Sequence, residues 1–408
     1  MSDVEIVTIV IDGVEVKVPK GTNLIEAAHS AGVEIPHYCY HRHLSIAGNC
    51  RMCQVEVEGR PKLEIACNTG AQEGMVVRTQ RTSERTADAQ RATLEFLLIN
   101  HPLDCTVCDQ AGHCKLQDYY YEYNAKPSRF IEQKRHKVKA EPFGPEVIYD
   151  GERCILCTRC VRFCDEVTKT GELGVFNRGV HAVIGIHEGR ELNNPLSGCV
   201  VDLCPVGALT HRRWRFNTRI WYTAEVDTVC PGCSTGCSAK VAVRDDQIVH
   251  VKGRLNTAVN QEWLCDEGRY GFGRFQPASR LHSQFVRDGD YLKELPLEEA
   301  LNAAAELRSG KGPQSRAVLL SPFLTLEEVW ASLAFAEKVM GLAPDSDSIA
   351  MQVKQRPLSD VEAVLISPDY APNARAMNLF GHGIEGEDWR AKLEARYAKV
   401  LTKLKHGV

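Results

Sequence analysis

The chain has 408 residues, 17 of them cysteine, and a formal net charge of −4 from 49 basic and 53 acidic residues. This length predicts two to four domains of roughly 100–200 residues each, and the near-neutral charge excludes a strongly basic nucleic-acid surface. The sequence has no apolar run long enough for a transmembrane helix, and Met1–Glu5 does not resemble the start of a secretory signal. Because so many cysteines occur in a chain read as leaderless, we expect a reducing cytoplasmic location, where metal ligation is favoured over disulfides.

The first predicted element is a hairpin over residues 5–18. Two strands rich in β-branched residues flank a turn at Asp12-Gly13. A short helix should follow, with Asn23 as its N-cap, Glu26 completing a capping box, and Gly32 at its end. A hairpin, a helix and then a cysteine loop predict a β-grasp ferredoxin domain over residues 1–80.

Helical periodicity returns over residues 83–100, where leucines share one face and His101-Pro102 ends the helix. A charged connector spans residues 120–150. A second hairpin is expected from strands 239–243 and 248–251, joined by a turn at residues 245–246.

The C-terminal segment has a different pattern, because no cysteine follows Cys265. Buried strands are predicted at 317–320 and 361–366. Helices are predicted at 326–340, with a Thr325–Glu328 capping box, and at 387–404. Residues 278–408 therefore read as a small α/β module, and the whole chain is predicted to be an α+β multidomain protein.

The first group of predicted metal ligands lies in the N-terminal domain: Cys39, Cys50, Cys53 and Cys67. Four thiolates from one loop suit an iron–sulfur cluster, and Gly48 allows the backbone to approach it closely. Behind a β-grasp start, the group predicts a [2Fe–2S] cluster. A structural zinc is the alternative, since zinc also takes four thiolates.

The second group lies in residues 81–120 and combines one histidine with three cysteines: His101, Cys105, Cys108 and Cys114. The three cysteines leave one position of a [4Fe–4S] cluster open, and His101 at the helix end is the predicted fourth ligand. His113 is the competitor, although it adjoins Cys114 and would strain the loop. Imidazole in place of thiolate removes a negative charge, which should raise the reduction potential.

The third group lies in residues 121–220 and joins a C-x2-C-x2-C run to a remote Cys-Pro pair: Cys154, Cys157, Cys160 and Cys204. This spacing is the bacterial ferredoxin pattern for [4Fe–4S]. Cys164 and Cys199 are left over. Cys164 occupies the position that serves a second cluster in two-cluster ferredoxins, but no second C-x2-C-x2-C run precedes Cys204. We interpret both as buried apolar thiols.

The fourth group lies in residues 221–277: Cys230, Cys233, Cys237 and Cys265. Glycines tighten the loop, and the second hairpin carries the chain back to the last cysteine. The group predicts a further [4Fe–4S] cluster, again with zinc as the alternative. In total, 15 cysteines and one histidine would hold one [2Fe–2S] and three [4Fe–4S] clusters. Several clusters in one chain indicate an electron wire, and no residue is predicted to be catalytic.

In this order, the four groups over residues 1–272 resemble the large iron–sulfur subunit of respiratory complex I, which is the G subunit of NADH:quinone oxidoreductase. The resemblance implies a binuclear cluster on the first group, a histidine-ligated tetranuclear cluster on the second, and a tetranuclear cluster on the third. It supports His101 over His113. The fourth group resembles an additional cluster of some bacterial members, in a domain of the molybdopterin-oxidoreductase type.

The resemblance also implies a role. A partner subunit would oxidise NADH at a flavin, and electrons would pass through this chain to quinone-side iron–sulfur subunits, coupled to proton translocation by the whole complex. The chain would be peripheral, without a membrane span, on the cytoplasmic side of the bacterial inner membrane. It would have no substrate-converting site of its own.

Residues 278–408 resemble a remnant of the family's long C-terminal domain, through the fragments at 319–322 and 367–373. The related molybdenum enzymes have a lysine two positions after the last cluster cysteine, where this chain has Glu267. No later cysteine could ligate molybdenum, so no molybdopterin is expected.

Two other functions fit part of the pattern. One is the iron–sulfur wire of an NAD-linked hydrogenase or formate dehydrogenase, in which the first three groups also occur. The other is a zinc-stabilised scaffold without redox function, which gives no reason for the ferredoxin spacing of residues 154–160.

Overall fold

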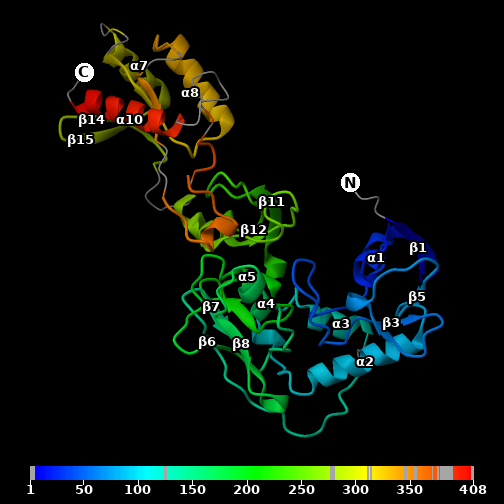
Figure 1. Ribbon diagram of the computed structural model, residues 1–408. Helices are drawn as coiled ribbons and strands as arrows, with labels where there is room; N and C mark the ends of the chain where they lie inside the picture. Colours follow the sequence, from blue (N-terminus) through cyan, green and yellow to red (C-terminus); the bar gives the residue numbers. More distant parts are fainter. Residues whose placement is uncertain are drawn as a thin grey trace. The chain divides into compact units, whose positions relative to one another are not determined.

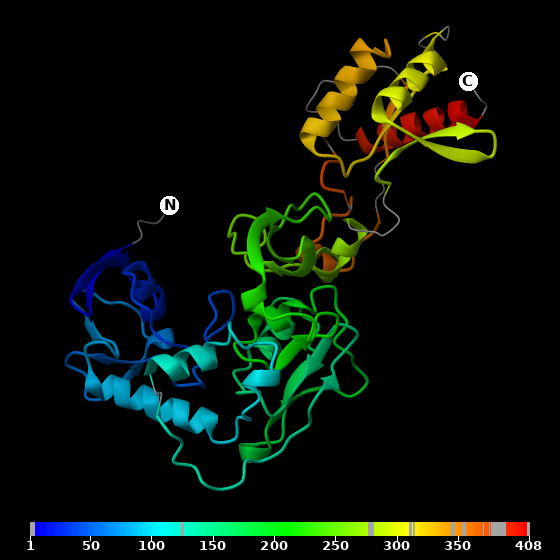
Figure 2. The same cartoon turned by 180° about the vertical axis from the view of Figure 1, so that it is seen from behind.

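The computed structural model describes residues 5–123, 126–275, 281–309, 312, 315–343, 347–352, 356–369, 371–374, 376 and 389–405. The chain forms two compact units, and Figures 1 and 2 show their elements from opposite sides. The first unit comprises residues 1–227, 239–255 and 261–266. The second comprises residues 228–238, 256–260 and 267–408.

The first unit begins with a five-stranded sheet in the order β2-β1-β5-β3-β4. Its strands are β1 (Ile6–Ile11), β2 (Val14–Pro19), β3 (Gln54–Val57), β4 (Glu64–Ile65) and β5 (Val76–Arg78). β1 pairs antiparallel with β2 and parallel with β5. The predicted hairpin over residues 5–18 is therefore confirmed, and it forms one edge of the sheet.

Helix α1 (Leu24–Ser30) follows the hairpin. The Asn23 side chain accepts hydrogen bonds from the Ile25 and Glu26 amides at 3.1 and 3.0 Å, which confirms it as the N-cap. The Glu26 carboxylate accepts a hydrogen bond from the Tyr40 hydroxyl at 2.9 Å, so this side chain fastens the cysteine loop. Gly32, with φ of +69°, turns the chain away after the helix.

Helix α2 (Glu84–Leu98) begins at Ser83, whose hydroxyl accepts a hydrogen bond from the Thr86 amide. The predicted helix over residues 83–100 is thus confirmed. It packs against β3 and against helix α3 (Lys115–Tyr123), as both views show. Helix α3 was not predicted from the sequence, where its tyrosine-rich stretch read as the start of a connector.

The middle of the first unit is built from short elements around the third cysteine group. A sheet in the order β10-β7-β6 combines β10 (Leu209–His211), β7 (Val147–Tyr149) and β6 (Glu141–Pro142). A separate hairpin pairs β8 (Leu173–Phe176) with β9 (Val183–Ile186). Two helices complete the region, α4 (Arg159–Glu166) and α5 (Cys199–Leu203).

A three-stranded sheet in the order β11-β12-β13 follows: β11 (Ala224–Val229), β12 (Ser238–Arg244) and β13 (Gln247–Gly253). Asp245 and Asp246 both have positive φ, at +50° and +58°. Two successive left-handed residues are what a tight hairpin turn requires. The second predicted hairpin is therefore confirmed.

Helix α6 (Asp266–Tyr270) and a 3-10 turn at Gly271–Phe275 lead into the C-terminal elements. These are β14 (Gln284–Asp288), β15 (Tyr291–Leu295), α7 (Leu297–Arg308), β16 (Val318–Leu320), α8 (Leu326–Lys338), β17 (Ile349–Met351) and α10 (Trp389–Lys405). The Thr325–Glu328 capping box is present at α8, as predicted. Helices α8 and α10 pack on the parallel pair β16–β17.

The prediction of a strand at 361–366 was wrong. Residues Glu362–Val364 form a 3-10 turn. The Ser359 hydroxyl accepts from the Glu362 amide at 3.3 Å, and the Glu362 carboxylate accepts from the Ser359 amide at 2.9 Å. This reciprocal cap starts a helical turn and outweighs the β-branched composition. The partner of β16 is β17 instead.

The predicted helix at 387–404 is present as α10 from Trp389, while positions 387 and 388 lie outside the described residues, as does Tyr370 of the fragment at 367–373. Within the described part of the chain, the structure has no helix of sufficient length and apolar character to cross a membrane.

Candidate metal centres

The first cysteine group is brought together between the loop after α1 and the 3-10 turn Ala66–Asn68. The Cys39 amide donates to the Cys50 sulfur at 3.5 Å. A hydrogen bond from the Cys50 thiol lowers the pKa of Cys39 to about 5, and a bond from Cys53 lowers the pKa of Cys67. The four sulfurs thus lie close enough to share protons and charge.

This group is continuous with the core of the N-terminal sheet. Cys53 and Cys67 are 1% and 0% exposed and pack among the valines and isoleucines of β1, β3 and β5. Two sulfurs of the first group are therefore held by the same packing that holds the sheet.

The second group places Cys105 at an exposed 3-10 turn and Cys108 and Cys114 in buried positions. Burial, together with a smaller contribution from the charges of Cys108 and Cys105, raises the pKa of Cys114 to about 11. The three cysteines are therefore gathered as the spacing predicted.

The two candidate histidines have different surroundings. Burial lowers the pKa of His101 to about 4, with Lys134 and Arg153 adding to the effect. Arg153 also acts on Cys108. Desolvation lowers the pKa of His113, whose charged neighbours are Lys252 and Glu225. His101 therefore shares the Arg153 environment with a cysteine of the group, whereas His113 faces the β11–β13 sheet.

The third group lines a single small cavity with all four of its sulfur-bearing residues: Cys154, Cys157, Cys160 and Cys204. Burial raises the pKa of Cys154, Cys157 and Cys204 to about 11, and the thiols of the group raise one another's pKa as well. Four thiolates so close and so poorly hydrated need a bound cation to be ionised together.

The two spare cysteines are fully enclosed. Cys199 is 1% exposed and its thiol donates to the Leu264 carbonyl at 3.2 Å. Cys164 is 0% exposed, and burial followed by the charge of Glu172 raises its pKa. Both environments agree with the interpretation as buried thiols.

The fourth group is divided between the two units. Cys230, Cys233 and Cys237 lie in the second unit, where the Cys230 amide donates to the Cys237 carbonyl at 2.8 Å and the Ser367 amide donates to the Cys233 sulfur at 3.4 Å. Cys265 is a buried residue of the first unit. Its role as the fourth ligand stays a prediction from spacing.

Single residues connect the first three groups, and none of these contacts was predicted from the sequence. The Arg162 guanidinium donates to the Cys39 carbonyl at 2.6 Å and to the Cys157 carbonyl at 3.2 Å. It therefore ties the first group to the third. Arg162 lies two positions after the C-x2-C-x2-C run, and a single arginine on a short helix carries no distinct signal in the sequence.

Tyr38 lies between the first and second groups. Its ring is 0% exposed and packs against Tyr119 at 5.4 Å between centroids. Burial raises the pKa of its hydroxyl, and the charges of Tyr119, Cys114 and Cys50 raise it further. Because the Tyr38 hydroxyl interacts electrostatically with a cysteine of each group, it lies near both groups.

Gly207 connects the second and third groups. It follows Cys204 by three residues, and a Cβ built on it would lie 2.2 Å from the Cys108 sulfur. Only glycine allows the backbone to pass this sulfur so closely. The Cys204–Gly207 segment thus holds one sulfur of the third group and touches one of the second.

These residues fit the iron–sulfur clusters that the cysteine spacing predicts. The donors are thiols in tight, poorly hydrated loops, which is the ligation such clusters require. A cavity lined by four cysteines and a glycine pressed against a sulfur are features that a packed apolar core would not contain. The buried guanidinium of Arg159, which acts on Cys157 and Cys204, would offset the charge of thiolates there.

Four family models match the chain in order. They are a 2Fe-2S iron-sulfur cluster binding domain (residues 5–82), the NADH-ubiquinone oxidoreductase-G iron-sulfur binding region (90–129), the ferredoxin-like domain of NADH-quinone oxidoreductase subunit 3 (144–210) and the molybdopterin oxidoreductase Fe4S4 domain (223–276). This series confirms the predicted fold class, and the chain therefore contains binding domains of both 2Fe–2S and 4Fe–4S type.

Among curated relatives, the G subunit of NADH-quinone oxidoreductase from Streptomyces coelicolor is 40% identical over 334 residues, covering 81% of this chain and 39% of the relative. The mitochondrial NADH-ubiquinone oxidoreductase 78 kDa subunit of Candida albicans is 38% identical over 355 residues, covering 86% of this chain and 48% of the relative. The chain thus spans less than half the length of either. A solved NAD+-reducing [NiFe]-hydrogenase aligns with a TM-score of 0.45 and 28% identity, over 52% of this chain and 91% of that one.

Proposed function

We propose that this chain, which belongs to the family of NADH-quinone oxidoreductase G subunits, relays electrons through iron–sulfur clusters from a flavin-bearing partner subunit towards quinone. The observation that carries the proposal is the joining of three cysteine groups within one compact unit. Arg162, Tyr38 and Gly207 each lie between two of these groups. Groups so connected suit stepwise electron transfer better than three independent structural metals would.

The proposed ligands follow the sequence groups. One [2Fe–2S] cluster takes Cys39, Cys50, Cys53 and Cys67, and one [4Fe–4S] cluster takes His101, Cys105, Cys108 and Cys114. A second [4Fe–4S] cluster takes Cys154, Cys157, Cys160 and Cys204. A third takes Cys230, Cys233, Cys237 and Cys265. The domain boundaries at residues 80, 120, 220 and 277 are part of the same proposal.

The clusters, when bound, supply reversible one-electron redox chemistry. The chain's own residues would set the reduction potentials of these clusters. Buried guanidinium groups stand beside the sulfurs, with Arg153 next to Cys108 and Arg159 next to Cys157 and Cys204. Positive charge in a poorly hydrated site stabilises the more negative, reduced state. These arginines would therefore raise the potentials of the second and third clusters.

The proposed partners and location follow from membership of the same family. The partners would be the other subunits of a complex I peripheral arm, including the NADH-oxidising flavin subunit and the quinone-side iron–sulfur subunits. The chain would then lie at the cytoplasmic side of the bacterial inner membrane without entering it. It would take part in proton translocation only as a component of the whole complex.

Electron paramagnetic resonance of the anaerobically isolated full chain tests the proposal. Reduction with dithionite should give one binuclear and several tetranuclear signals, and elemental analysis should find iron with acid-labile sulfide. A colourless protein that contains zinc without iron would support the scaffold alternative and reject the proposal. Co-purification of the natively expressed chain with a hydrogenase large subunit, in place of proton-pumping membrane subunits, would indicate that the chain is the iron–sulfur subunit of an NAD-linked hydrogenase.

A further inference from the structure

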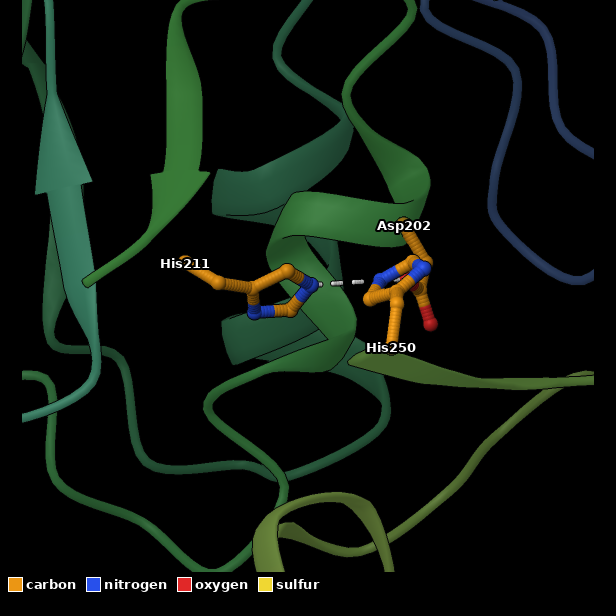
Figure 3. A group of neighbouring side chains, drawn as sticks. All are labelled: Asp202, His211 and His250. Carbon is orange, nitrogen blue, oxygen red and sulfur yellow. Dashed lines mark ion pairs between the residues drawn. The ribbon is translucent and has the colours of Figure 1, made fainter. Parts of the chain in front are cut away.

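A group of potential metal ligands lies apart from the cysteine groups. Asp202, His211 and His250 each offer one ligand atom, and these atoms all lie within 4.8 Å of one another. Figure 3 shows the His211 imidazole pointing towards the Asp202 carboxylate and the His250 ring. No sequence motif unites the three positions.

Each ligand is carried by a different element of the first unit. Asp202 lies in α5, His211 ends β10, and His250 lies in β13. Helix α5 packs against both strands. Side chains on packed regular elements are held in place more firmly than side chains on loops, so their convergence is a fixed property of the fold.

The distances suit a small cation. The His211 Nε2 and Asp202 Oδ1 atoms are 3.8 Å apart, longer than a hydrogen bond between these two atoms. Two ligands of a tetrahedral zinc ion, each about 2.0–2.1 Å from the metal, are separated by about 3.4 Å. Rotamer adjustments of a few tenths of an ångström would bring the pair to that separation.

The surroundings leave room for the ion and for one further ligand. The three side chains line a cavity of ≈ 350 Å³ together with Trp214. The Trp214 ring packs edge-on against both imidazoles, at 4.5 Å from His211 and 4.3 Å from His250, and so supports their orientations. Two basic side chains, Arg215 and Lys252, also line this cavity, and Lys252 forms an ion pair with Glu225 at 2.6 Å.

We propose that Asp202, His211 and His250 form a binding site for one divalent transition-metal ion of the zinc type, with water from the cavity as the fourth ligand. Two imidazoles and one carboxylate are a common ligand set for such ions. The absence of sulfur among these ligands distinguishes the site from all four cysteine groups. Because α5 ends directly before Cys204, the ion would fasten the segment that carries this cysteine to β10 and β13.

Zinc binding to the full chain tests the site. The protein is isolated anaerobically with its iron, treated to remove adventitious zinc, and titrated with Zn²⁺ against a fluorescent chelator. Zinc K-edge X-ray absorption then identifies the donor atoms. We expect one tightly held ion per chain, with a shell of nitrogen and oxygen at about 2.0 Å and no sulfur at about 2.3 Å.

Matched variants localise the ion. His250→Gln and Asp202→Asn should each weaken zinc binding at least tenfold, whereas His282→Gln, at an exposed position in the second unit, should leave it unchanged. Iron content, measured on the same samples, reports folding independently of zinc. If His250→Gln loses iron, its zinc affinity is not interpreted, and the zinc affinity of the isosteric Asp202→Asn variant tests the site instead.

Either of two results would overturn the proposal: a sulfur shell around the zinc, or wild-type affinity in the variants that keep their iron. The proposal does not depend on the electron-transfer function, because the iron and resonance measurements test that function separately.

Discussion

The core of the N-terminal sheet and the core of the C-terminal module contain different types of side chain. The N-terminal core surrounds β1, β3 and β5 and includes Cys53 and Cys67. The C-terminal core, formed by α8, α10, β16 and β17, contains only aliphatic and methionine side chains among its described residues. Both have capped helices and buried strands, so the difference lies in what the interior must bind.

This difference predicts two modes of stabilisation. Thiolates gathered in a buried group repel one another unless a metal is bound, and metal binding is then coupled to folding. Aliphatic side chains gain free energy from burial in proportion to the area removed from water. Folding of the N-terminal part should therefore be coupled to metal, whereas folding of the C-terminal module should not be.

Removal of iron tests this contrast most strongly. In the iron-free full chain, amides of β3 and of the turn Ala66–Asn68 should lose most of the roughly 5–15 kcal/mol that protects a typical domain against unfolding. Amides of α8 should keep their protection, since no thiol lies in that core. Hydrogen exchange followed by mass spectrometry measures both regions in one sample. Equal loss of protection in α8 would contradict the contrast.

The predictable parts of the fold are those decided by local chemistry. The hairpin at residues 5–18, the Asn23 cap and the Thr325–Glu328 capping box follow from short-range patterns and are present. The strand predicted at 361–366 is absent because the reciprocal hydrogen bonds between Ser359 and Glu362 start a 3-10 turn, despite the β-branched residues of this segment. Helix α3 was missed because its stability comes from packing on α2, which no local pattern records.

The candidate sites also differ in whether they depend on local sequence patterns or on contacts between distant residues. Cysteine spacing within a loop is local, so the gathering of the second group and of Cys154, Cys157 and Cys160 could be predicted, whereas the distant Cys204 was assigned from the ferredoxin pattern. The contacts that join the groups are not local, because Arg162 reaches Cys39 across 123 positions. The Asp202, His211 and His250 group likewise comes from three separate elements. Only the folded chain brings such residues together.

The aliphatic core offers the converse test. Leu333→Ala on α8 should destabilise the C-terminal module by about 2–5 kcal/mol, because the side chain is 2% exposed and its removal leaves a cavity. The resonance signals and iron content should not change. Leu326→Ala on the same helix is the matched control, since Leu326 is 38% exposed and should cost far less. Loss of iron in Leu333→Ala would show that the two cores are coupled.

A smaller effect is expected where backbone and sulfur meet. Gly207→Ala would place a Cβ 2.2 Å from the Cys108 sulfur, so the second group must shift. Overpacking of this kind costs about 1–3 kcal/mol. One tetranuclear signal should change or disappear while the binuclear signal remains. Gly273→Ala is the control, because a Cβ there would meet nothing within 4 Å. Unaltered spectra in Gly207→Ala would place the second cluster away from Cys108.

The last substitution should leave the fold intact and change only a potential. His101→Cys replaces a neutral imidazole by a thiolate at the proposed fourth position of the second cluster. The added negative charge disfavours the reduced state, so the midpoint potential should fall by on the order of 100 mV or more. Redox titration followed by resonance measures this shift for one tetranuclear signal. His113→Gln is the control, because His113 faces Lys252 and Glu225 and should leave every midpoint unchanged. An unchanged midpoint in His101→Cys, together with a lost signal in His113→Gln, would reassign the ligand to His113.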